Sequence, residues 1–287
     1  MSEVPQSHEQ GFDQLIEEAL LQPVPNMDGL RERKKGYNDL PIDTAHPKFS
    51  EPLVDIADYG LAGQAYYSRP NAATEEPVPG VPSNMYLRKS VAETLAKINT
   101  ALQNPAITEF FGGEVELYAE DALRPVSLQT QLHDELIPAL LRDNHPDMSD
   151  EEVAERIKDL IAVPSSDPKK PSPHATGGAL DIILRYKQDT SDYVEGSQIP
   201  IGHSDADTSD RILPDYFELH EPQTDEDRQA QRNRRAYYAI MTGQAFGVET
   251  GLVCNPTEWW HWGSGDQLAA KVRGDEAAYY SLAEPNQ

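Results

Sequence analysis

The sequence predicts an α+β fold with an antiparallel sheet, and the pattern of its hydrophobic residues is the reason. Apolar and polar residues alternate over 115–123, and a second strand is expected over 178–186. Two further strands are expected at 246–254 and 257–262, joined by the turn signal Asn255-Pro256. Helical segments interleave with these strands without the regular alternation of βαβ units, which favours an antiparallel over a parallel sheet.

Apolar residues at helical spacing predict helices over 11–21, 127–142 and 225–242. In the second of these helices, the stripe expected to face the core consists of Leu128, Leu132, Leu136 and Leu140. Two more helices are expected to begin at capping boxes, in which a serine and a glutamate three residues later bond each other's backbone N–H groups. These pairs are Ser90 with Glu93 and Ser149 with Glu152.

The first part of the chain shows little periodicity. Residues 22–85 are rich in Pro, Asn, Gly and Tyr, so we expect a long irregular arm with one short strand at Leu53–Ile56. Such an arm can cover a cleft, mediate dimerisation or wrap the core, and the sequence does not decide between these roles.

Composition excludes several classes of protein. The chain has 287 residues with 24 Lys+Arg against 49 Asp+Glu, and a net charge of -25 argues against binding to nucleic acid or anionic membranes. The single cysteine, Cys254, excludes an intramolecular disulfide and a CxxC zinc site. Apolar runs are too short for a membrane span, and Met1–Gln6 lacks the basic start of a signal peptide. We therefore expect a cytoplasmic protein.

Two short stretches contain the residues with catalytic potential. The first carries His174 and Asp181, and the second, Glu258-Trp259-Trp260-His261, follows about eighty residues later. Two imidazoles and two carboxylates can supply three zinc ligands and one general base, which is the composition of a catalytic zinc site with one position open for water. A single histidine is more often structural than a metal ligand, so the prediction of one zinc ion per chain rests on the whole set.

Glu258 and His261 meet a geometric objection. In an ideal strand, residues three apart point to opposite faces of the sheet. The two side chains can converge only if the strand bulges, twists or ends between them. We accept this irregularity as part of the prediction.

The motifs resemble those of a known family. Ser172-x-His174-x-x-Gly177-x-Ala179-x-Asp181 matches the SxHxxGxAxD motif of the M15 metallopeptidases, and Glu258-Trp259-Trp260-His261 matches the ExxH half in the form typical of D-alanyl-D-alanine dipeptidases of the VanX type. The resemblance implies zinc on His174, Asp181 and His261, with Glu258 as the general base. It also implies the fold of that family, in which helices flank a small antiparallel sheet that carries the zinc cleft.

Further segments extend the resemblance. Leu123-Arg124-Pro125 is similar to the segment whose arginine stabilises the transition state, although the family often has Tyr where Leu123 stands. By the same resemblance Ser172 contacts the amino group of the substrate, and an aspartate after Gly202 pairs with it. Its spacing is shifted here, so Asp205 and Asp207 are both candidates, and we prefer Asp207. Asn233–Met241 also resembles the family.

The resemblance implies a zinc-dependent hydrolysis of the D-alanyl-D-alanine dipeptide, in which Glu258 activates metal-bound water and D-alanine is released. Residues 1–50 are expected to be an N-terminal extension, and 51–287 the catalytic domain. The alternatives are a D,D-carboxypeptidase or another peptidoglycan peptidase of the same family, and a non-catalytic metal-binding module. The expected setting is D-alanine salvage, cell-wall turnover or glycopeptide resistance, with a small dipeptide as the partner.

Overall fold

The computed structural model describes residues 7–71, 74, 76–203 and 208–283, and it confirms the α+β fold. The strands are β1 Leu53–Asp55, β2 Ala62–Gly63, β3 Tyr86–Arg88, β4 Val115–Asp121, β5 Ala179–Tyr186, β6 Val253–Cys254 and β7 His261–Gly263. The helices are α1 Ser7–Leu20, α2 Asp28–Lys34, α3 Lys89–Ala101, α4 Pro105–Phe111, α5 Val126–Gln131, α6 Ile137–Asn144, α7 Asp150–Leu160, α8 Tyr216–Leu219, α9 Asp225–Thr242 and α10 Gln267–Arg273.

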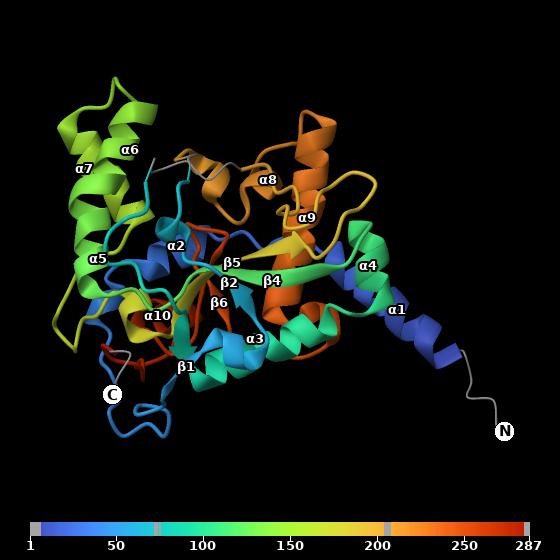
Figure 1. The fold of residues 1–287 in the computed structure, drawn as a ribbon, viewed down its shortest axis with the longest axis horizontal. Coiled ribbons are helices and arrows are strands. Elements are labelled where there is room, and N and C mark those ends of the chain that lie inside the picture. The colour runs from blue at the N-terminus through green and yellow to red at the C-terminus, as the bar shows by residue number, and fades with distance from the viewer. Residues whose placement is uncertain (1–6, 72–73, 75, 204–207, 284–287) are drawn as a thin grey trace.

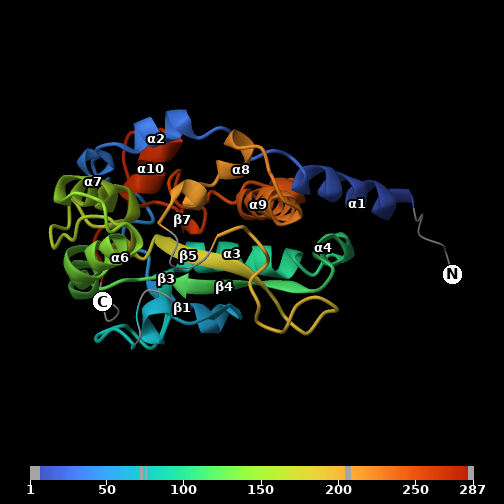
Figure 2. The same cartoon turned by 90° about the horizontal axis from the view of Figure 1, so that it is seen from above.

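The main sheet has the strand order β2-β4-β5-β7-β6, and β1 pairs separately with β3. All pairings in the main sheet are antiparallel except that of β2, which joins the edge of β4 in parallel. Figure 1 shows β4 and β5 crossing the centre, with α5–α7 at one end of the molecule and α1 and α4 at the other, and Figure 2 shows the same arrangement from above.

Apolar residues from the sheet and from several helices form the main core. Leu117 of β4, Leu184 of β5 and Trp262 of β7 are each fully buried in it. Tyr237 of α9 packs against Trp262, and its hydroxyl donates a hydrogen bond to the carbonyl of Ile182. Both faces of β5 are covered, so this strand is rigidly held where it carries site residues into the interior.

The predicted helix at 127–142 forms, but its buried stripe differs from the prediction. A π-helical turn at Leu132–Leu136 separates α5 from α6, and the N–H of Ile137 reaches back to the carbonyl of Leu132. The extra residue in this turn rotates the following helix, so Ile137 and Leu141 are buried where the periodic pattern had placed Leu136 and Leu140. Pro138 has no backbone N–H to continue regular α-helical bonding here.

The two predicted capping boxes have different outcomes. The box of Ser149 and Glu152 is confirmed at the start of α7. The other prediction is wrong, because α3 already begins at Lys89 and has Arg88 as its N-cap residue. Ser90 donates its hydroxyl and its backbone N–H to Glu51 instead, so a carboxylate from a distant segment binds the first turn of this helix.

The N-terminal segment is more ordered than its composition predicts. α1 confirms the predicted helix and β1 the predicted strand, but α2 was not anticipated. Helix α2 buries no residue of its own, so its position depends on contacts made by neighbouring residues and by polar side chains. Met27, just before it, is fully buried. The domain boundary at residue 50 stays a prediction. None of the described helices is long and apolar enough to cross a membrane.

Candidate metal centre and catalytic site

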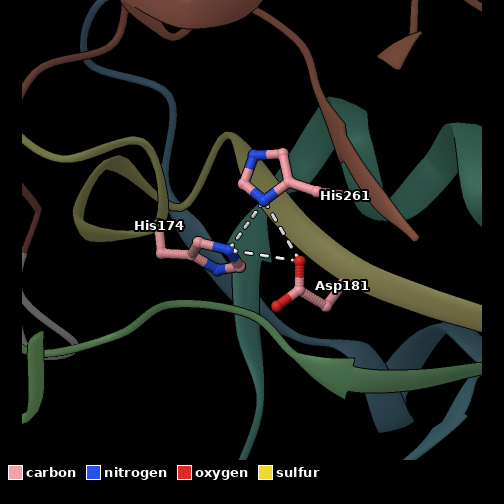
Figure 3. Close-up of side chains that lie close together, drawn as sticks. All are labelled: His174, Asp181 and His261. Atoms are coloured by element: carbon pink, nitrogen blue, oxygen red, sulfur yellow. Dashed lines mark hydrogen bonds and ion pairs between the residues drawn. The ribbon is translucent and has the colours of Figure 1, made fainter. Parts of the chain in front are cut away.

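His174, Asp181 and His261 meet in the interior and point their polar atoms at one another (Figure 3). His174 Nε2 lies 3.1 Å from His261 Nδ1, and Asp181 Oδ1 lies 3.1 Å from His261 Nδ1 and 3.4 Å from His174 Nε2. Both histidines are buried, at 4% and 5% exposure. Residues 87 positions apart in the chain therefore converge on a single point.

The register of the sheet explains why two of these side chains converge. Asp181 of β5 is the direct partner of His261 of β7 and, on its other side, of Asp121 of β4. Directly opposite residues in an antiparallel pair project to the same face. An irregularity between Ala119 and Asp121 inserts one residue into β4, and this bulge aligns Asp121 with Asp181 where regular pairing would place Glu120.

His174 comes from a short 3₁₀ helix, Pro173–Thr176, that directly precedes β5. Its Nδ1 is 2.9 Å from the carbonyl oxygen of Ala122, which can only accept, so Nδ1 donates this hydrogen bond and Nε2 is the ring nitrogen that faces Asp181 and His261. The 3₁₀ helix ends at Gly177, whose φ of 69° lies in the left-handed region that favours glycine. This turn sends the chain into β5.

Glu258 lies outside the strand that contains His261, which resolves the geometric objection. β7 begins only at His261, and the preceding residues form turns, with the N–H of His261 bonded to the carbonyl of Glu258. The carboxylate oxygen Oε2 of Glu258 therefore lies 3.9 Å from His261 Nδ1. The predicted strands at 246–254 and 257–262 are accordingly much shorter in the structure.

Asn255 holds the Glu258 carboxylate in place. Its side-chain amide donates a hydrogen bond of 2.6 Å to Glu258 Oε2. Burial raises the pKa of Glu258 to about 7, an effect that nearby His261 opposes and Asp181 reinforces. A carboxylate with a pKa near neutrality can both accept and return a proton, as a general base requires.

Asp181 and Arg124 keep their charges although both are buried. Burial opposes the ionisation of Asp181, but the charges and hydrogen bonds of His174 and His261 outweigh it and keep its pKa well below the ordinary value. Arg124 lies beside the cluster and bonds Asp121 at 2.7 Å, with Asp181 Oδ2 at 3.6 Å. Burial opposes its charge, and the attraction of Asp121 overcomes this and raises the pKa of Arg124.

The donor set fits a small tetrahedral cation. A tetrahedral ion with bonds of about 2.0–2.1 Å holds its ligand atoms roughly 3.3 Å apart. The spacings of 3.1–3.4 Å between the two nitrogens and the carboxylate oxygen agree with this value. Two imidazole nitrogens with one carboxylate suit zinc, whereas calcium and magnesium prefer shells made mostly of oxygen atoms.

Two cavities adjoin the cluster and share Asp181. The first is lined by all three residues of the cluster together with Glu258 and Arg124. The second is lined by Glu120, Asp121, His203, Trp259 and Trp260 among others. Asp181 therefore borders both cavities.

Of the predicted substrate-binding residues, the structure describes Ser172 alone. Ser172 is buried at 2% exposure and lines neither of them, and its hydroxyl has no hydrogen-bond partner in the described part of the chain. Its predicted contact with the substrate stays a prediction. Asp207, and with it Asp205, lies outside the described residues.

Several site residues were missed by sequence reasoning. Asp121 and Asn255 bond directly to Arg124 and Glu258, and Lys34 and Tyr37 line the first cavity from the N-terminal segment. Asp121 ends the alternating strand just before the arginine, a position from which its role could have been suspected. For Lys34 and Tyr37 no local pattern gives a signal, because they lie more than 200 residues from the loop that they contact.

Comparison with known proteins agrees with the geometry. A family model for peptidases M15, described as D-Ala-D-Ala dipeptidase, matches residues 115–278. A D-alanyl-D-alanine dipeptidase of Synechocystis sp. (strain ATCC 27184 / PCC 6803 / Kazusa) is 32% identical over 166 residues, which cover 54% of this chain and 62% of that protein. The match thus spans less than two thirds of the length of this relative. The family match contains the whole cluster with Glu258 and Arg124, but neither Lys34 nor Tyr37.

Proposed function

Because this chain belongs to the M15 peptidase family, described as D-Ala-D-Ala dipeptidases, we propose that it is a zinc-dependent enzyme that hydrolyses D-alanyl-D-alanine to D-alanine. The observation that carries the proposal is the convergence of His174, Asp181 and His261 at ligand spacing, with Glu258 next to them. A purely structural cluster has no need of a carboxylate whose pKa burial raises to about 7 beside it.

We assign the metal-binding role to His174 Nε2, Asp181 Oδ1 and His261 Nδ1. A zinc ion held by these atoms would supply an acidified water molecule and would polarise the peptide carbonyl group. The proton on His174 Nδ1 bonds the Ala122 carbonyl, and this fixes the ring with its other nitrogen toward the metal position.

Glu258 moves the proton in this proposal. It takes a proton from water as the new C–O bond forms at the peptide carbonyl carbon. When the C–N bond breaks, it returns this proton to the leaving amine of D-alanine. The 2.6 Å hydrogen bond from Asn255 keeps the carboxylate oriented during both transfers.

Arg124 stabilises the negative charge that develops on the carbonyl oxygen. Its guanidinium is fixed by Asp121 and by the side-chain oxygen of Gln129, at 2.9 Å, so little reorganisation is needed during the reaction. The guanidinium lines the same cavity as Glu258, which supports the assignment of both groups to one bound substrate.

The test is D-alanine release from D-Ala-D-Ala, with N-acetyl-D-Ala-D-Ala as the matched blocked substrate. Chelator-sensitive release from the free dipeptide alone is the expected result. Cleavage of the acetylated substrate would assign the chain to the carboxypeptidase alternative. A chain that binds zinc but cleaves neither substrate would refute the proposed activity.

The Glu258→Gln variant separates the base from the metal ligands. We expect turnover to fall by about 10²- to 10⁴-fold, the range for loss of a general base, while zinc binding measured by equilibrium dialysis is retained. His174→Ala is the contrasting variant, because it removes a ligand and should lose both zinc and activity. Retained turnover in Glu258→Gln would exclude the assigned role.

A further inference from the structure

Lys34, the last residue of α2, reaches the cavity that contains Glu258 and the three-residue cluster. Its Nζ donates hydrogen bonds to the Thr257 hydroxyl at 2.5 Å and to the Asn255 side-chain oxygen at 3.4 Å. Both partners are neutral. Both belong to residues 255–260, the segment between β6 and β7 that contains Glu258. Burial lowers the pKa of Lys34, and the charges of Glu258 and Asp159 oppose that change.

Lys34 differs from the other cations of this cavity. Arg124 is paired with Asp121, and Lys158 forms an ion pair with Glu155. Among the described cations that line the cavity, Lys34 alone has no carboxylate within ion-pair distance, in a chain with a net charge of -25. A partly buried cation without a paired anion is costly unless an anion binds there during function.

The position of α2 is firmly fixed. Arg31 binds the fully buried carboxylate of Asp215 through contacts of 2.8 and 3.0 Å, and also bonds the carbonyl of Pro256 at 3.2 Å. The backbone N–H of Met27 donates to the same carboxylate at 2.8 Å. The bond to Pro256 joins α2 to the segment between β6 and β7, and the bonds to Asp215 join it to the segment just before α8. The ammonium of Lys34 is therefore held in position against this cavity.

The chemistry of the reaction indicates which anion this is. In a dipeptide, the amine released by cleavage and the terminal carboxylate are attached to the same Cα. The group that returns a proton to the amine must therefore lie close to the group that binds the carboxylate. Asn255 joins the two candidates, because its amide donates to Glu258 and its oxygen accepts from Lys34.

The second cavity differs in its cations. Its described lining includes three carboxylates and no lysine or arginine, whereas the described lining of the first cavity has three cations beside its three carboxylates Asp159, Asp181 and Glu258. A dipeptide carries its positive charge at the amino end and its negative charge at the carboxyl end. The two cavities, which share Asp181, match this polarity when the leaving residue lies in the cavity that Lys34 lines.

We propose that Lys34 binds the free C-terminal carboxylate of the dipeptide and so restricts the enzyme to substrates that end one residue after the scissile bond. This inference rests on the proposed dipeptidase function and extends it. It assigns a specificity-determining role to the N-terminal segment, which the family match at 115–278 does not include.

The test compares D-Ala-D-Ala with its C-terminal amide, D-Ala-D-alaninamide, in the wild-type chain and in Lys34→Met. In wild type we expect kcat/KM for the acid to exceed that for the amide by roughly ten- to a hundredfold, the value of a hydrogen-bonded charge pair. In Lys34→Met this preference should disappear, through a lower kcat/KM for the acid and an unchanged value for the amide.

Lys35→Met is the matched control. Lys35 is the next residue, is 72% exposed at its side chain and pairs with Glu32, so the control should keep the wild-type preference. If the wild-type enzyme cleaves the acid and the amide equally well, that result alone would overturn the proposal. Equal losses for both substrates in Lys34→Met would also overturn it, because Lys34 would then act through Asn255 on Glu258.

Calorimetric titration distinguishes failure of this inference from failure of the proposed function. The acid should bind wild type more tightly than the amide, and Lys34→Met should bind both alike. If wild type hydrolyses neither substrate but shows this binding difference, the dipeptidase function fails and the carboxylate site stands. If the acid and the amide bind equally, or neither binds, the carboxylate site is refuted whatever the activity.

Discussion

Glu258→Gln should make the metal-free protein more stable while it removes catalysis. The glutamate side chain is only 12% exposed, and burial raises its pKa from 4.5 to about 7. Glutamine has nearly the same volume and can still accept the hydrogen bond from Asn255 through its amide oxygen. The substitution therefore removes a buried charge and leaves the packing unchanged.

The magnitude and its sign follow from linkage. An acid whose pKa is raised on folding binds its proton more tightly in the folded state, so folding stability falls as pH rises between the two values. A rise from 4.5 to about 7 corresponds to about 3 kcal/mol. Near pH 4.5 the two proteins should differ little, and above pH 7 the variant should be more stable by about 3 kcal/mol.

The assay is urea denaturation in the presence of a chelator, at pH 4.5 and pH 8, for wild type and variant. The difference between the two proteins isolates Glu258 from other groups that titrate in this range. Glu109→Gln, on an exposed residue, is the control and should change the free energy of unfolding by less than about 0.5 kcal/mol at either pH. A variant less stable than wild type at pH 8, or a difference independent of pH, would refute the reasoning.

Three further predictions concern the surroundings of the site. Arg124→Lys should lower kcat by about 10²- to 10³-fold with zinc binding unchanged, because lysine cannot reproduce the planar fork that faces the oxyanion; unchanged kcat would contradict the role. Asp215→Asn should lower the free energy of unfolding by about 1.5–3 kcal/mol, since it removes the buried anion from Arg31 and leaves the exposed Asp28 as its ion-pair partner; a loss below about 1 kcal/mol in urea denaturation would count against this. Gly178→Ala should lower the free energy of unfolding by about 1–3 kcal/mol, because the added Cβ would lie 2.7 Å from the Ser264 carbonyl oxygen. Gly29→Ala is the contrasting variant, since its Cβ would meet open space on α2, and it should raise the stability; thermal denaturation of both variants measures the difference.

The sequence predicts the centre of the site well because each residue there has a recognisable spacing. The histidines and carboxylates of the cluster lie in two compact motifs, and the strand that carries Asp181 has a continuous apolar pattern. The π turn before α6 is different, because one inserted residue rotates everything after it. The sequence gives no sign of this inserted residue, because the apolar pattern continues regularly through it. The pattern therefore predicted Leu136 and Leu140 as buried, whereas Ile137 and Leu141 are.

The two capping boxes show where local patterns lose to tertiary contacts. Ser149 begins its helix after a turn, and Glu152 is the one side chain of the described residues that bonds its hydroxyl, so the local pattern decides. Ser90 follows directly from β3, which delivers the chain in helical position one residue earlier. The Glu51 carboxylate then accepts both the hydroxyl and the N–H of Ser90, and so takes the N–H that Glu93 would have accepted in a capping box.

Lys34 marks the limit of sequence reasoning for this chain. α2 is short and contains a glycine, and it has no buried stripe, so its helical state depends on a carboxylate at residue 215. The same bonds determine where the side chain of Lys34 points. Neither the helix nor the role of Lys34 can therefore be predicted from the local sequence alone. The proposed substrate preference therefore depends on two distant parts of the chain: the motifs at 172–181 and 258–261, and Lys34 of the N-terminal segment. Exchanging the N-terminal segment should change the preference for the acid over the amide while leaving the ligand cluster intact, and steady-state kinetics on both substrates measures that change.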